Sequence, residues 1–273
     1  MPQHKFITKQ LIDKGWSEDK KYCLTDEQGK RFLLRVSPIE QYDRKKSEYE
    51  LMSQVATLGV PMCKPLEFGT SDEGVYSIQT WIDGVDVEEN VHNLTCEEQY
   101  SYGFEAGRIL KEIHKIPAPK GIEDWEIYFN RKADRKIKMY EECPIKYENG
   151  QAFIDYINAH RYLLIGRPRT YQHGDYHIGN MMIGNDKQLY IIDFNRNDFG
   201  DPWEEFNRIV WCAQKTPLFA SGIVNGYFDD NVPMGFWRLL ALYISSNTLS
   251  SVYSSIVKTF SRSIKPLCNQ NTR

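Results

Sequence analysis

The residues best suited to chemistry lie in one segment, YQHGDYHIGNMMIGNDKQLYIIDFN, at positions 171–195. Asn180 follows Asp175 by five residues, and a short apolar stretch then leads to Asp193. Transfer of a phosphoryl group to a hydroxyl needs a carboxylate that orients and deprotonates the acceptor, and hard oxygen ligands that hold magnesium on the β- and γ-phosphates. The order and spacing therefore predict Asp175 as the catalytic base and Asn180 and Asp193 as the magnesium ligands.

Two apolar runs, 181–183 and 189–192, are typical of a hairpin that would bring Asp193 back beside the base loop. A literal D-F-G tripeptide begins five residues later, at Asp198. Asp193 directly ends an apolar strand, where a metal ligand is rigidly presented, whereas the residues before Asp198, at 195–197, are polar and predict a loop. We therefore expect the metal ligand to be Asp193 and interpret the D-F-G tripeptide as a coincidence.

The first ninety residues have the patterns of strands and one helix. Strands are predicted at 22–26 and 31–37, with a hairpin turn between them, and at 75–82. Between them, apolar residues recur at helical spacing over 42–58, and Gly59 and Pro61 end that helix. This part of the chain is predicted to be rich in β-structure.

The chain after about residue 93 is predicted to be mainly helical. A capping-box pattern at 95–98 begins one helix, and two more are expected at 124–142 and 152–164. A compact strand-and-loop region at 171–200 precedes helices that continue to the end. Strands first and helices later predict an α+β chain with two lobes, an N-lobe at 1–82 and a C-lobe at 83–273.

The motif H-G-D-x-x-x-x-N at 173–180, together with Asp193, resembles the catalytic and metal-binding loops of the aminoglycoside phosphotransferase and choline kinase family. The resemblance covers most of 15–208 and includes G-D-P at 200–202. It implies a bilobal protein kinase-like fold with a β-rich N-lobe and a mostly helical C-lobe. Protein kinases commonly carry arginine where this chain has Gly174, and no A-P-E segment follows, so the small-molecule branch fits better.

The family has a lysine on an N-lobe strand that contacts the α- and β-phosphates and pairs with a helix glutamate. The matching strand carries Arg35 at that position, and its helix partner by alignment is Glu48, with Glu50 as the second choice. Alternation along the strand puts Leu33, Arg35 and Ser37 on one face, which we expect to line the nucleotide cleft. An arginine would bind phosphate with a fork of donors rather than a point charge.

The remaining nucleotide contacts are implied by the same resemblance. The loop that covers the phosphates would be 15–21, where Ser17, Lys20 and backbone N–H groups supply donors. The connection between the lobes, including Gln79 and Trp81, would lie against the nucleotide. The expected cofactors are magnesium and ATP, with GTP possible.

The acceptor cannot be identified from the sequence: aminoglycoside, macrolide, choline-like, sugar and amino-alcohol substrates all remain. His173 is interpreted as structural, and His177 is undecided between the substrate and the protein. Glu205 stands where the family usually has aspartate, and no acidic terminal motif follows, which disfavours a specific assignment to antibiotic modification. Two alternatives are a catalytically silent nucleotide-binding protein of the same fold and a protein kinase.

Composition limits the partners and the compartment. The chain has 273 residues, of which 41% are hydrophobic and 26% charged, with a formal net charge of -3. Because there is no excess of basic residues, we expect neither a nucleic-acid nor a membrane partner. The oligomeric state is left open. Six cysteines form no C-x-x-C pair, and the first residues have no apolar core of signal-peptide length, so we expect a cytoplasmic protein.

Overall fold

The computed structural model describes residues 5–13 and 19–264, with side chains as far as Val252. The contacts between its residues divide the chain into two compact units. The first comprises residues 1–116, 171–198 and 209–231, and the second comprises 117–170, 199–208 and 232–273. The boundaries of these units differ from those of the predicted lobes, 1–82 and 83–273. The division into lobes therefore stays a prediction.

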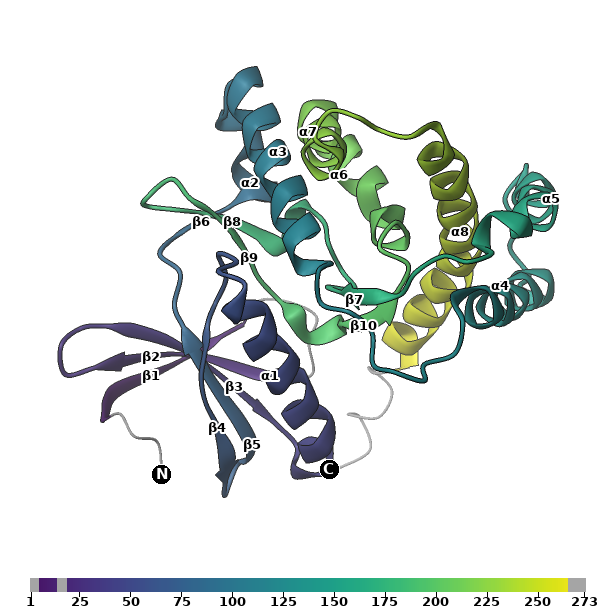
Figure 1. The fold of residues 1–273 in the computed structure, drawn as a ribbon. Coiled ribbons are helices and arrows are strands. Elements are labelled where there is room, and N and C mark those ends of the chain that lie inside the picture. The colour runs from purple at the N-terminus through teal and green to yellow at the C-terminus, as the bar shows by residue number, and fades with distance from the viewer. Residues whose placement is uncertain (1–4, 14–18, 265–273) are drawn as a thin grey trace. The chain divides into compact units, whose positions relative to one another are not determined.

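A five-stranded antiparallel sheet opens the first unit (Figure 1). Its strands, in spatial order, are β1 (Phe6–Ile12), β2 (Lys20–Asp26), β3 (Arg31–Ser37), β5 (Gly74–Thr80) and β4 (Pro65–Ser71). The predicted hairpin is confirmed, because an Asp26 carboxylate oxygen accepts from the backbone N–H groups of Gln28 and Lys30 and closes the turn. Strands β1 and β4 were not predicted from the sequence.

The predicted alternation along β3 is also confirmed. Phe32, Leu34 and Val36 are buried in an apolar cluster with residues of β2 and β5. Leu33 and Arg35 lie on the opposite face and line a pocket. Burial of the apolar residues therefore fixes which face of the sheet carries Arg35.

Helix α1 (Tyr42–Thr57) follows a 3-10 turn (Ile39–Gln41) and packs against β4 and β5 (Figure 1). It confirms the predicted helix and ends just before Gly59, whose φ of 76° is the left-handed conformation that glycine adopts without strain.

A second, three-stranded sheet joins the segment after β5 to residues 181–191. Its strands are β6 (Gly84–Asp86), β8 (Met181–Gly184) and β9 (Leu189–Ile191), paired antiparallel in the order β6-β8-β9. The predicted apolar hairpin is thus present and has β6 beside it. This pairing fixes the loop that carries Asp175 and Asn180 to residues 84–86, which follow β5.

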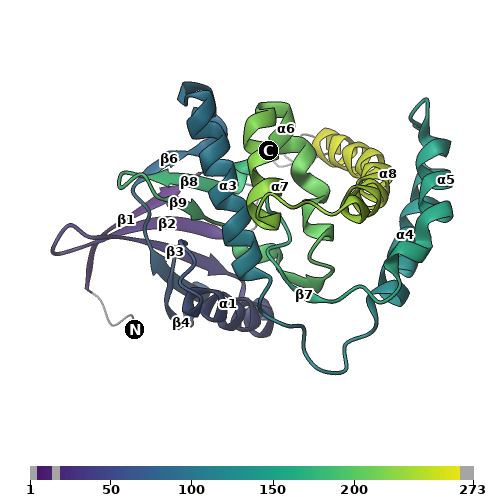
Figure 2. The same ribbon diagram turned by 45° about the horizontal axis from the view of Figure 1, so that its top comes forward.

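Two helices of the first unit, α3 (Cys96–Ile113) and α7 (Pro217–Phe228), lie side by side (Figures 1 and 2). The predicted capping box is confirmed, because the Thr95 hydroxyl accepts from the Glu98 N–H and the Glu98 carboxylate accepts from the Thr95 N–H. Gly103 and Gly226 face the opposite helix so closely that a β-carbon would collide with its backbone. The unit also contains α2 (Val87–Asn90), α6 (Ile209–Lys215), and 3-10 turns at Val91–Asn93, Ile178–Asn180 and Phe194–Arg196.

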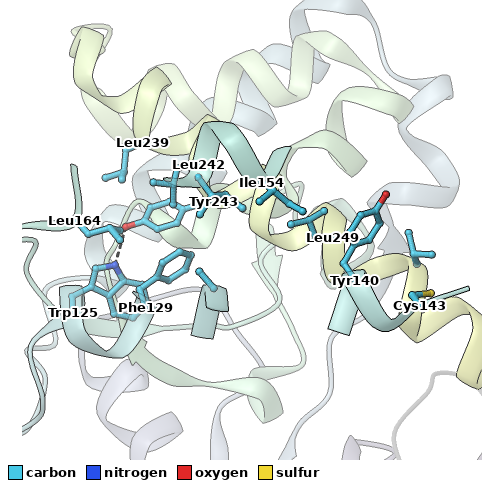
Figure 3. Packing of buried hydrophobic residues seen from close by; sticks show 13 residues of the cluster. Trp125, Phe129, Tyr140, Cys143, Ile154, Leu164, Leu239, Leu242, Tyr243 and Leu249 are labelled. Atoms are coloured by element: carbon cyan, nitrogen blue, oxygen red, sulfur yellow. Dashed lines mark hydrogen bonds between the residues drawn. The ribbon is translucent and has the colours of Figure 1, made fainter. Parts of the chain in front are cut away.

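The second unit is a helical cluster of α4 (Trp125–Glu142), α5 (Gly150–His160) and α8 (Met234–Ile264), with 3-10 turns at Arg161–Leu164 and Glu204–Arg208. Figure 3 shows its core, in which the Trp125 indole N–H donates to the Tyr243 hydroxyl at 2.8 Å. The helix predicted at 152–164 is present but ends as a 3-10 turn. None of the helices in the described ranges has both the length and the apolar character needed to cross a bilayer.

Asp201 combines a local backbone contact with an ion pair in the core. Its carboxylate accepts from the Trp203 N–H at 2.9 Å, but it also binds the Arg167 guanidinium with both oxygens and accepts from the Tyr243 hydroxyl at 2.6 Å. The helix that follows is a 3-10 turn, and the carboxylate is fully buried. Asp201 is therefore a core ion-pair residue of the second unit.

Candidate functional site

His173 holds the base loop in place. It follows β7 (Thr170–Gln172), is fully buried, and donates from Nε2 to the carbonyl of Ile192 at 2.9 Å. Its Nδ1 accepts from the Asp175 N–H at 3.3 Å. One imidazole thus ties the backbone of Asp175 to the residue before Asp193, which agrees with the structural role predicted for His173.

Gly174 lies where the base loop comes close to the segment after Asp193. Its φ is 81°, and a β-carbon there would collide with the carbonyl oxygen of Arg196. A residue with a side chain would be strained at this φ and would also push the two segments apart. Gly174 therefore allows Asp175 and Asp193 to belong to one compact site.

The Asp175 carboxylate is partly exposed, at 15%, and lies between two basic side chains. Arg196 Nη1 is 3.3 Å from one oxygen, and His177 Nε2 is 3.4 Å from the other. His177 Nδ1 accepts from the Gly179 N–H at 3.1 Å, and its Nε2 also lies 3.5 Å from the Asn180 amide nitrogen. His177, whose role the sequence left undecided, thus faces the Asp175 carboxylate.

Asn180 lies on the same loop. Its side-chain NH₂ donates to the backbone carbonyl of Asp175 at 2.8 Å, and its own backbone carbonyl accepts from the Ile192 N–H at 3.0 Å. Because the amide nitrogen is held by the loop, the amide oxygen points away from that hydrogen bond. An oxygen so oriented suits a hard cation.

Asp193 follows the β9 strand in the left-handed conformation, at φ 69° and ψ 55°. Non-glycine residues rarely adopt it, and such conformations concentrate at functional sites. One carboxylate oxygen accepts from Arg35 Nη1 at 2.8 Å. Burial alone would raise the pKa of Asp193, but the nearby charges of Arg35 and Lys21 outweigh it and lower the pKa. The carboxylate is therefore held ionised, as a metal ligand must be.

A pocket in the first unit collects five of the predicted site residues, together with Lys21. The site residues that line it are Lys21, Arg35, Gln79, Trp81, Asn180 and Asp193. Gln79 lies on β5 opposite Leu33, and Trp81 packs against the Arg31 guanidinium at 5.3 Å. The predicted metal ligands and the residues Gln79 and Trp81 of the predicted connection thus share one pocket.

Arg35 lies in the pocket wall, but its predicted pairing with Glu48 is wrong. Its Nε and Nη2 donate to one oxygen of Asp19 at 3.2 and 3.0 Å, and its Nη1 donates to Asp193. Glu48 accepts instead from two basic residues of its own helix, Arg44 and Lys45, at 2.8 and 2.9 Å. The strand arginine is therefore held by carboxylates on both sides.

Asp19 is the centre of this network and was missed by sequence reasoning. Its carboxylate, 4% exposed, accepts from Arg35, from the Ser37 hydroxyl at 2.7 Å and from Lys45 at 3.1 Å. Burial alone would raise its pKa, but these donors lower it from 3.8 to about 2. A chain of ion pairs thus runs from Glu48 through Lys45, Asp19 and Arg35 to Asp193. The three-residue spacing of Lys45 and Glu48 on a helix was the one signal available from sequence.

The β2–β3 register decides which lysine reaches the pocket. Lys21 is paired with Arg35, whereas Lys20 is paired with Val36. Lys20 is exposed and belongs to the other face of the sheet, so the structure does not bring the predicted donor to the pocket. Lys21 lines the pocket, and burial there lowers its pKa. Ser17, the other predicted loop donor, lies outside the described residues.

The D-F-G tripeptide forms a short strand, β10 (Asp198–Gly200), where a loop was expected. Asp198 is exposed and does not line the pocket that holds Asp193. The geometry therefore favours Asp193 over Asp198 as a ligand.

The residues fit a magnesium ion shared with phosphates. Within residues 5–13 and 19–252, no three histidine, cysteine, aspartate or glutamate side chains are grouped to hold a metal ion alone. Magnesium commonly takes one or two protein oxygens and completes its shell with substrate phosphates and water. Asn180 and Asp193, one amide and one carboxylate in a single pocket, match that ligand set.

Known structures share this fold. The crystal structure of spectinomycin phosphotransferase APH(9)-Ia with ADP and spectinomycin matches with a TM-score of 0.63 at 17% identity, over 98% of this chain and 86% of that one. The GDP complex of a mutant aminoglycoside 2'-phosphotransferase-IIIa matches with a TM-score of 0.66 at 12% identity, over 99% and 96%. A choline/ethanolamine kinase family protein from Mesorhizobium loti matches with a TM-score of 0.66 at 13% identity, over 92% and 80%.

These likenesses show a mixed α/β kinase-like fold with a β-rich N-terminal region and a helical C-terminal part. No curated protein sequence matches the chain significantly. The model of the phosphotransferase enzyme family APH, however, matches residues 9–238. The chain therefore belongs to the APH phosphotransferase enzyme family.

Proposed function

We propose that the protein transfers the γ-phosphoryl group of ATP or GTP to a hydroxyl of a small molecule. The observation that carries this proposal is the pocket in which Asn180 and Asp193 meet Gln79 and Trp81, next to the loop that carries Asp175. The family supports phosphotransfer, and ADP and GDP are present in similar structures.

Asp175 is the proposed base. The acceptor oxygen attacks the γ-phosphorus, the bond to the β–γ bridging oxygen breaks, and the nucleoside diphosphate leaves. The hydroxyl proton passes late to the Asp175 carboxylate, which lies between the side chains of Arg196 and His177. Asn180 and Asp193 would hold magnesium, which neutralises charge on the β- and γ-phosphates.

The acceptor class is left open among aminoglycosides, macrolides, choline-like compounds, sugars and amino alcohols. The experiment measures magnesium-dependent nucleoside diphosphate release by the purified protein with a panel of these acceptors. We expect acceptor-dependent turnover in the parent protein. In Asp175→Asn we expect turnover lower by about 100-fold or more, because the general base is lost, with nucleotide affinity nearly unchanged.

Equal turnover in parent and variant would remove Asp175 from the base role. Nucleotide binding without turnover for any acceptor would favour the alternative of a silent nucleotide-binding protein. Phosphorylation of a protein substrate in place of the small molecules would favour the protein kinase alternative.

A further inference from the structure

Two cationic side chains face the pocket from adjacent strands, Lys21 on β2 and Arg35 on β3. They are direct cross-strand partners, so both project from the same face of the sheet. Asp193 lines the same pocket. Either cation is therefore near the position where nucleotide phosphates would meet the magnesium ligands.

The two cations differ in how firmly they are held. Arg35 is 10% exposed and donates through all three of its nitrogens, to Asp19 and Asp193. Turning this guanidinium toward a phosphate would break charge-assisted hydrogen bonds in a buried network, which is costly. Arg35 is thus suited to hold Asp193 in position.

Lys21 is only partly buried, and its ammonium group forms no hydrogen bond or ion pair with any described residue. An ammonium group on a flexible stem can follow a phosphate with three donors. A half-buried pocket cation that makes no hydrogen bond or ion pair with the described residues is suited to an anionic ligand.

We propose that Lys21 is the residue that binds the β- and γ-phosphates of the nucleotide, and that Arg35, held by Asp19, positions Asp193. This assignment rests on the proposed function. It transfers the phosphate contact from the β3 strand, where the family usually has a lysine, to the neighbouring strand. In this chain two cationic side chains, Lys21 and Arg35, line the pocket in which the family resemblance predicts one lysine.

The test compares Lys21→Met with Lys20→Met, a matched control one residue away on the opposite face. Equilibrium dissociation constants are measured by calorimetry for AMP, ADP and ATP, each with magnesium. Loss of charge-assisted hydrogen bonds to the terminal phosphates should weaken ATP binding to Lys21→Met by about 10- to 100-fold. AMP binding, which also reports that the variant is folded, should stay unchanged, as should all three affinities in Lys20→Met.

Lys21→Met that binds ATP as tightly as the parent would overturn the assignment, as would an equal loss for AMP and ATP. An equal loss of ATP affinity in Lys20→Met would also overturn it. If the parent binds none of the three nucleotides, the proposed function falls and this inference with it. That result is distinct from a parent that binds ATP and a Lys21 variant that does so equally well.

Discussion

Asp19→Asn is expected to destabilise the fold by removing the charge at the centre of the buried network. The carboxylate is 4% exposed and accepts from Arg35, Ser37 and Lys45. An amide of the same shape keeps the packing but brings two donors to a place where every neighbour donates. The cations of Arg35 and Lys45 then lose their shared counter-charge.

The magnitude follows from the pKa of Asp19, which is lowered from 3.8 to about 2. A shift of one pKa unit corresponds to about 1.4 kcal/mol, so the ionised carboxylate contributes about 2 kcal/mol to the free energy of unfolding at pH 7. Because the folded pKa is the lower one, this contribution is present above pH 3.8 and is lost as the pH falls toward 2. Linkage leaves roughly half of this contribution at pH 3.

Urea unfolding of parent and Asp19→Asn at pH 7, 5 and 3 measures this contribution. The difference in unfolding free energy should be about 2 kcal/mol at pH 7 and 5 and should be about half as large at pH 3. Glu50→Gln is the control. Glu50 is 60% exposed and lies 4.0 Å from Lys46, a long distance for an ion pair, so the substitution should change the unfolding free energy little at every pH. Equal stability of parent and Asp19→Asn at pH 7, or a difference that does not change with pH, would refute the reasoning.

The remaining predictions concern the metal ligand and the base loop. Asp193→Ala should abolish the magnesium dependence of nucleotide binding, while Asp198→Ala should leave it intact. A magnesium titration of each variant measures this, and the reverse result would place the metal site at the D-F-G tripeptide. Gly174→Ala should destabilise the protein more than Gly29→Ala, because both have φ near 80° but only Gly174 would collide with a backbone carbonyl. Urea unfolding measures the loss of unfolding free energy in each variant. Equal losses would contradict the prediction, because they would mean that the contact with the Arg196 carbonyl adds no destabilisation.

Features set by local backbone geometry could be predicted from the sequence. The direction of Arg35 follows from the period of two along a strand whose apolar residues must be buried. The capping box at Thr95 depends on residues three positions apart and needs no tertiary contact. Likewise, the step of five positions from Asp175 to Asn180 keeps both on one loop, and an apolar hairpin brings the chain back at Asp193.

What only the tertiary structure decided is the set of partners around these residues. Asp19 lies just before β2, and its three partners lie 16, 18 and 26 positions further along the chain. Nothing local links them, so the family pattern suggested Glu48 as the partner of Arg35. Lys20 and Lys21 are adjacent in the sequence, so their side chains lie on opposite faces of the strand. The choice between them required the β2–β3 register, because pairing with β3 fixes the face on which each lysine lies.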